Sequence, residues 1–373
     1  MTLSEKYSYR INVPEQLLED LSARLSLARW PNHQLMPGWE TGTDPVLLHH
    51  LTDYWQNHYN WRAQEENLNG FRQFRIPVEG CQLHFVYEQA SSSHDESTLP
   101  VLVLHGWPST FVQMTRILPL LIQSCDVVVP SLPGFAFSDQ PDCSGANLAE
   151  MARMFHILMT RVLGYERYVV RGTDYGLAIA LILGSLYPES VAGVHVGGTH
   201  LEVQEVPDDL EPEEREFIRA SRAWYADEGG YVSIQSTKPQ TLGYALNDSP
   251  VGLLAWITEK HRTWCADPDG LLEIFNEDYL LTTAMIYWVS QTITSSMRLY
   301  YEERLRPSEQ PPVGVPLAIN QPALEEFFPP RSWWERFQPV RRWTLLEGAG
   351  HFPEWEAPYA LVKDLREFIG TLR

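Results

Sequence analysis

The feature that most constrains the fold is a series of short apolar runs separated by stretches of helical periodicity. The runs cover residues 101–104, 127–129, 168–170 and 191–196. A strand that is buried on both faces needs such an uninterrupted run. Between them, apolar residues recur every three or four positions, as in 148–162. This alternation predicts an α/β fold, in which a mostly parallel sheet carries helices on both faces.

The alternation stops near residue 202 and resumes at 313–319 and 343–346. The segment 202–216 is acidic and contains two prolines, which favours a solvated face, and the sequence up to about 305 has mostly helical periodicity. Because roughly 100 residues without a sheet pattern interrupt the α/β unit, we expect them to form a helical lid.

The first 93 residues are rich in tryptophan but show no core of their own. Two amphipathic helices are predicted, one after Val13 and one over 47–58, and residues 74–87 suggest one or two edge strands around the turn 79–80. Large indole rings with few apolar neighbours usually pack on another part of the chain. We therefore expect an arm that wraps around the main body.

Composition narrows the classes of partner. The 373 residues include 28 Lys and Arg against 48 Asp and Glu, a net charge of −20. This charge disfavours binding to nucleic acid, which needs a basic face, and binding to anionic lipid. Four scattered cysteines form no CxxC pair, so neither a disulfide framework nor a zinc site is indicated, and we expect ordinary buried thiols. They are Cys81, Cys125, Cys143 and Cys265.

The sequence shows no sign of membrane insertion or export. The amino terminus lacks an apolar signal region, and no window approaches the roughly 20 apolar residues of a membrane span. The expectation is a soluble, cytoplasmic protein without a membrane anchor.

The strongest chemical signal lies at 169–178, where a strand pattern runs into Gly172-x-Asp174-x-Gly176 and then into a helix of small residues. This is the pattern of a nucleophile elbow, with Asp where many proteins have Ser. Glycines permit the tight turn and the close strand–helix approach that raise the central side chain above the sheet. Asp174 is the predicted nucleophile, although an aspartate can also simply cap a helix.

Two further segments fit the same chemistry. Residues 105–108, His-Gly-Trp-Pro, follow the first buried strand, where one backbone N–H of an oxyanion hole is expected. The predicted donors are the N–H groups of Trp107 and Tyr175. His351, in a glycine-rich loop after the last strand, completes the chain order of nucleophile, acid and base. By position, both Glu325 and Glu326 qualify as the acid.

Taken together, these segments resemble the α/β-hydrolase epoxide hydrolases, in particular the microsomal and juvenile-hormone type with an N-terminal extension. The likeness covers nearly the whole chain and departs at residues 172–176, Gly-Thr-Asp-Tyr-Gly, where Gly-Gly-Asp-Trp-Gly is commoner. The matching segments are 29–31, 105–108, 133–135, 230–239, 245–253, 257–260, 295–300 and 350–352.

The resemblance implies an eight-stranded sheet and a division of the chain. Residues 1–96 would form the N-terminal extension, packed on core and lid, and 205–307 the helical lid. The core would comprise 97–204 and 308–373. The resemblance also implies that Tyr231 and Tyr300 are lid acids and that Glu325 is the triad acid, and it implies no cofactor or metal.

Chemistry favours this reading of the residues. An aspartate that attacked a carboxyl substrate would form a labile anhydride, whereas opening an epoxide gives a stable ester. The leaving alkoxide needs an acid, and a phenol with a pKa near 10 stays protonated at neutral pH. We therefore expect Asp174 to attack the ring while the two tyrosines hold its oxygen, and His351 to activate water that releases a vicinal diol.

Two other functions remain open at this stage. A haloalkane or haloacid dehalogenase also uses an aspartate, but typically places a Trp N–H after it, where this chain has Tyr175. A non-catalytic homologue that binds a ligand under its lid would usually have lost part of the triad. The aromatic lid suggests a small hydrophobic or aryl epoxide, with water as co-substrate, and a homodimer is possible.

Overall fold

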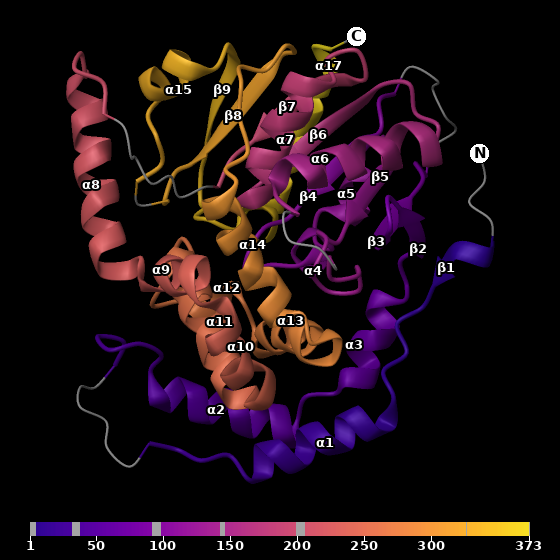
Figure 1. Ribbon diagram of the computed structural model, residues 1–373, viewed down its shortest axis with the longest axis vertical. Coiled ribbons are helices and arrows are strands. Elements are labelled where there is room, and N and C mark those ends of the chain that lie inside the picture. The colour runs from indigo at the N-terminus through magenta and orange to yellow at the C-terminus, as the bar shows by residue number, and fades with distance from the viewer. Residues whose placement is uncertain are drawn as a thin grey trace.

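The computed structural model describes residues 5–31, 38–91, 98–141, 146–198, 206–325 and 327–372, and its centre is one mixed sheet (Figure 1). The strand order is β1-β2-β3-β5-β4-β6-β7-β8-β9. Pairing is antiparallel from β1 to β5 and parallel from β5 to β9. The strands are β1 (Ser8–Tyr9), β2 (Gln73–Val78), β3 (Cys81–Glu88), β4 (Val101–Leu104), β5 (Val127–Pro130), β6 (Tyr168–Gly172), β7 (Val191–Val196), β8 (Leu317–Pro322) and β9 (Val340–Leu346).

The mostly parallel α/β sheet is confirmed, but the predicted strand count is wrong. Within the described residues the sheet has nine strands instead of eight. The additional strand is β1, whose two residues are too few to show a period-two pattern. The predicted hairpin forms β2 and β3, although β3 is not an edge strand because β5 pairs along its other side.

Helices cover both faces of this sheet. Neighbouring residues on a strand point to opposite faces. On β7, Gly193 faces Phe368 of α17 (Pro358–Gly370), and Val194 faces Gly184 of α7 (Tyr175–Leu186). The other core helices are α4 (Phe111–Met114), α5 (Leu118–Leu121), α6 (Leu148–Ile157), η2 (Leu158–Val162), α15 (Arg331–Phe337) and α16 (Pro353–Glu356).

The insertion between β7 and β8 is helical, as its periodicity predicts. Asn276 accepts a hydrogen bond from the N–H of Tyr279 and so starts α13, a helix that is buried on nearly every side. The helices in the described part of the insertion are α8 (Pro212–Glu228), α9 (Gly230–Thr237), α10 (Pro239–Asp248), α11 (Pro250–Trp264), α12 (Leu271–Ile274), α13 (Glu277–Ser290) and α14 (Ile293–Leu305).

Helices α1 (Glu15–Ser26) and α2 (Pro45–Asn57) of the N-terminal segment run along the lid on the side away from the sheet (Figure 1). Hydrogen bonds join Thr43 to the carbonyl of Ala255 and Tyr59 to Thr282. Its helices are η1 (Glu5–Tyr7), α1 (Glu15–Ser26), α2 (Pro45–Asn57) and α3 (Trp61–Leu68). The predicted domain limits at 96/97 and 204/205 lie outside the described residues, and the division of the chain stays a prediction.

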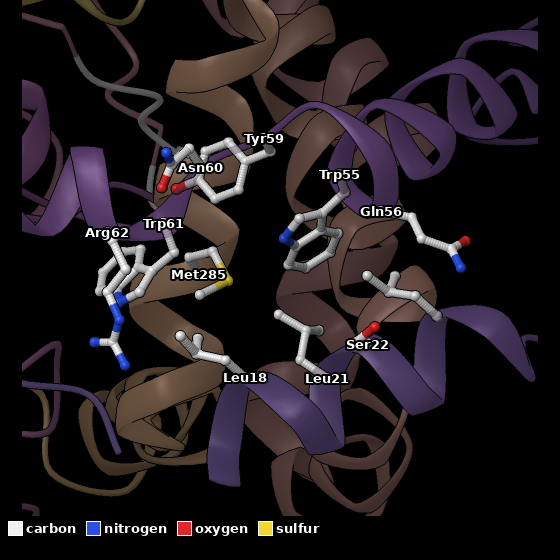
Figure 2. Close-up of a pocket in the computed structure, with 11 residues that line it drawn as sticks. Leu18, Leu21, Ser22, Trp55, Gln56, Tyr59, Asn60, Trp61, Arg62 and Met285 are labelled. Atoms are coloured by element: carbon white, nitrogen blue, oxygen red, sulfur yellow. The ribbon is translucent and has the colours of Figure 1, made fainter. Parts of the chain in front are cut away.

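A mainly apolar cavity of about 370 Å³ lies among the helices of this segment, next to the lid. Figure 2 shows Leu18 and Leu21 of α1, Trp55 of α2 and Trp61 of α3 around it, facing Met285 of α13. The cavity therefore lies mostly within the arm, and the lid contributes Met285 to its lining.

Two expectations from composition can be compared with the structure. Cys81, Cys125 and Cys265 are buried thiols as predicted, and Cys143 lies outside the described residues. In the described part of the chain, no helix has the length and apolarity needed to cross a bilayer.

The strand–helix approach at the elbow can be tested by adding one methyl group. A Cβ at Gly176 would lie 2.3 Å from the backbone oxygen of Leu104, whereas a Cβ at Gly370 meets nothing within 4 Å. Gly176→Ala should lower the free energy of unfolding by about 3 kcal/mol or more. Gly370→Ala should leave it unchanged or raise it by up to about 1 kcal/mol. Urea unfolding measures both, and equal stabilities would contradict the close packing.

Candidate active site

Asp174 stands at the turn between β6 and α7, in a backbone conformation that few residues adopt. Its φ is 52° and its ψ is −127°, and its N–H donates to the carbonyl oxygen of Gly198 at 2.7 Å. A Cβ at Gly106 would lie 2.1 Å from Oδ1 of Asp174. Only glycine at position 106 leaves room for the carboxylate at this place.

The two oxygens of the Asp174 carboxylate have different partners. Oδ1 accepts the N–H of Trp107 at 3.0 Å and that of Tyr175 at 2.7 Å. Oδ2 lies 3.3 Å from Nε2 of His351. The structure thus brings both predicted backbone donors onto one oxygen and the imidazole onto the other.

His351 lies between two carboxylates. Its Nδ1 is 2.9 Å from Oε1 of Glu325, and both side chains are buried. Burial alone would lower the pKa of His351, but the hydrogen bonds to Asp174 and Glu325 outweigh it and raise that pKa to about 10. The charged form of the imidazole is therefore favoured in the resting site. The other candidate acid, Glu326, lies outside the described residues.

The two lid tyrosines converge above the predicted oxyanion hole. Tyr231 of α9 stacks on the indole of Trp107 at 5.4 Å, and Tyr300 of α14 meets the same ring edge-on at 5.9 Å. The rings of Tyr231 and Tyr300 are 6.0 Å apart, and that of Tyr175 is 5.0 Å from Tyr300. Burial raises the pKa of both lid phenols well above 10, and the charge of Asp174 adds to the shift. Both phenols are thus neutral donors.

Sequence reasoning gave no catalytic or positioning role to three further residues around this site. The carbonyl oxygen of Trp264 accepts the N–H of His351 at 2.9 Å, and Lys260 Nζ lies 4.8 Å from the centre of the Tyr231 ring. Glu356 accepts N–H groups on either side of His351. The sequence could have indicated Glu356. It lies in a short helix that starts just after the His351 loop, where an acidic side chain can accept hydrogen bonds from the N–H groups of that loop.

Two family models match the chain. The model described as epoxide hydrolase N terminus matches residues 6–114, and that of the alpha/beta hydrolase fold matches residues 100–358. Together they cover the arm, the core strands and the lid.

Relatives and solved structures agree with these matches. The chain is 32% identical to epoxide hydrolase 1 of Sus scrofa, over 98% of this chain and 88% of that protein. The crystal structure of juvenile hormone epoxide hydrolase from Bombyx mori matches with a TM-score of 0.86 and 29% identity, covering 98% of this chain and 94% of the other. For epoxide hydrolase from Aspergillus niger the TM-score is 0.86 and the identity 26%, over 98% and 96%. The chain therefore belongs to the epoxide hydrolases of the α/β-hydrolase fold.

Proposed function

We propose that this protein hydrolyses small apolar epoxides to vicinal diols through a covalent ester on Asp174. The observation that carries the proposal is that the two oxygens of the Asp174 carboxylate have different hydrogen-bond partners. Oδ1 is held by the N–H groups of Trp107 and Tyr175, which leaves Oδ2 as the attacking atom. Attack of Oδ2 on a ring carbon breaks one C–O bond of the epoxide and forms a hydroxyalkyl ester.

The leaving oxygen receives its proton from the lid. An alkoxide is a poor leaving group, and the neutral phenols of Tyr231 and Tyr300 can donate to it as it develops charge. Their rings both lie against the indole of Trp107, which supports a shared role of the two phenols at one oxygen. One phenol becomes a phenolate at this step.

Ester formation changes the charge around His351. The negative charge of Asp174 is lost, and with it one of the two interactions that raise the pKa of His351. The imidazolium can then give up a proton, which balances the proton that the phenolate takes back. The neutral imidazole, oriented by Glu325, accepts a proton from water as that water attacks the ester carbonyl.

In the resting site, Oδ1 of Asp174 occupies the predicted oxyanion hole. The ester carbonyl oxygen is Oδ1, which accepts two N–H bonds before the reaction begins. Charge that develops on Oδ1 in the tetrahedral intermediate therefore meets preorganised donors. Collapse of this intermediate releases the diol and regenerates the carboxylate and the imidazolium.

The surroundings favour an apolar or aryl substituent on the epoxide. The rings of Trp107, Trp264 and Tyr231 contact one another at centroid distances of 5.2–6.2 Å. Such a wall attracts apolar surface and offers few polar contacts to a charged substrate.

The nucleophile can be tested by turnover and by mass. Wild-type protein should convert styrene oxide to its diol, and Asp174→Ala should lower turnover by about four orders of magnitude or more. His351→Gln should form the ester but fail to hydrolyse it, so that mass spectrometry finds the mass of one epoxide on the peptide that contains Asp174. Diol from Asp174→Ala at the wild-type rate would overturn the proposal. A chloroalkane should release no chloride, in contrast to a dehalogenase.

The lid acids can be tested on ester formation alone. In the His351→Gln background, Tyr231→Phe and Tyr300→Phe should each slow ester formation by about 10- to 100-fold, because one phenol remains. The double variant should lose about 10³-fold or more. Tyr279→Phe removes another buried lid hydroxyl and should change the rate less than twofold. Rapid-quench mass spectrometry gives these rates, and an unchanged rate in the double variant would exclude both acids.

The imidazolium predicts a pH dependence of stability. The pKa of His351 is about 10 in the folded protein and near 6.5 in the unfolded chain. Unfolding between these pH values releases a proton, so His351 contributes stability that is complete below about 6.5 and lost as pH rises through 10. Urea unfolding at pH 7 and 9.5 measures the free energy of unfolding. Between these pH values it should fall more steeply in the wild type than in His351→Gln, by at most about 1.4 kcal/mol per pH unit. Parallel slopes would contradict a charged resting His351.

A further inference from the structure

One carboxylate outside the predicted triad holds the loop that carries His351. Glu356 ends α16, and its side chain turns back toward the preceding loop. Its Oε2 accepts the N–H of Gly350 at 2.9 Å and that of Phe352 at 3.0 Å, and its Oε1 accepts the N–H of Ala266 at 2.5 Å. The same group therefore binds the histidine loop and the chain just after lid helix α11.

The loop and the end of α11 are in close contact. The N–H of His351 donates to the carbonyl oxygen of Trp264 at 2.9 Å. A Cβ at Gly350 would lie 2.6 Å from the nitrogen of Ala266. Since the N–H groups of residues 350, 351 and 352 all bond to Glu356 or Trp264, the backbone of His351 is fixed against the lid end.

We propose that Glu356 is a positioning residue that fixes His351 for the hydrolysis of the ester. Hydrogen bonds from N–H groups to a carboxylate are stronger than those to a neutral acceptor, and three such bonds converge here. Without them, the loop would keep the Trp264 hydrogen bond to the lid and ring contacts such as the stacking of Phe352 on His261. This inference rests on the proposed two-step reaction.

The effect should fall on one step of that reaction. Ester formation needs the carboxylate of Asp174 and the lid phenols, which come from other elements. Only the second step needs the imidazole of His351 to face both a water molecule and the ester carbonyl. A misplacement of about 1 Å can slow a reaction about 100-fold, so loosening this loop should slow hydrolysis and leave alkylation nearly intact.

The neighbouring carboxylate of α16 has different partners. Glu354 accepts Nε of Arg171 at 3.0 Å and the side-chain amide of Gln113 at 2.8 Å. It thus joins α16 to strand β6 and to α4, whereas Glu356 joins it to the histidine loop. Of these two acids, only Glu356 touches the loop on both sides of His351.

The test measures the fraction of the enzyme that carries the covalent ester during turnover. Glu356→Gln keeps the size of the side chain but places an amide N–H₂ against one of the three N–H donors. With styrene oxide at pH 8.5, above the pKa of about 7 to which burial raises Glu356, kcat should fall about 10- to 100-fold. KM should fall with it. Mass spectrometry during turnover should find the ester on most of the enzyme, while its rate of formation changes less than threefold.

Glu214→Gln is the matched control. Glu214 is a fully buried carboxylate that accepts a backbone N–H and pairs with Arg336 at the start of lid helix α8. Glu214→Gln should lower the free energy of unfolding without ester accumulation. A smaller folded fraction lowers the observed rates of ester formation and ester hydrolysis equally.

A fall in kcat of Glu356→Gln without ester accumulation would overturn the positioning role, as would unchanged kinetics. If this variant does not fold, Glu356→Asp, which keeps the charge on a shorter side chain, gives the same decision through its ester fraction. Absence of any ester in His351→Gln would instead refute the proposed function, so the two failures are distinguishable.

Discussion

The site depends on one carboxylate held above the edge of the sheet by two backbone N–H groups. These donors come from Trp107, after β4, and Tyr175, at the start of α7, and both point to Oδ1 of Asp174. Their convergence requires the left-handed φ of Asp174 and glycines at positions 106 and 176, where any Cβ would overlap neighbouring atoms. The same geometry fixes Oδ1 on these two donors and leaves Oδ2 facing His351, so the two oxygens have different surroundings.

In the proposed mechanism, the charges around His351 set the order of the two reaction steps. In the resting state two carboxylates surround one imidazole, and the imidazolium neutralises part of their charge. A base that is already protonated cannot activate water, so the resting site is not set for hydrolysis. In the proposed mechanism, esterification of Asp174 removes one charge and thereby lowers the pKa of His351. The first step creates the base that the second step requires.

The sequence predicts the core and the grouping of Asp174 with His351 well because both are local patterns. An elbow such as 172–176 needs only five adjacent residues to specify its turn, and His351 follows a strand visible as an apolar run. Tyr231 and Tyr300 could be selected among 17 tyrosines only by resemblance, since their meeting above Trp107 is a product of helix packing in the lid. Strand β1 has only two residues, too few to show a periodic pattern. The hydrogen bond between Glu356 and Ala266 joins positions 90 residues apart, so no local pattern predicts it.

The position of the lid must be as exact as that of the elbow, because the phenols belong to one and the carboxylate to the other. Contacts from two sides act on the lid. The histidine loop donates to the carbonyl of Trp264 at the end of α11, and Glu356 of α16 accepts the N–H of Ala266 just after it. The N-terminal arm reaches the opposite side, where Thr43 bonds to Ala255 of α11 and Tyr59 to Thr282 of α13. Since α11 receives contacts from both the arm and the histidine loop, and its Trp264 contacts the ring of Tyr231, the arm is in a position to affect how that ring sits. None of the arm's described residues has a contact with the Asp174 carboxylate.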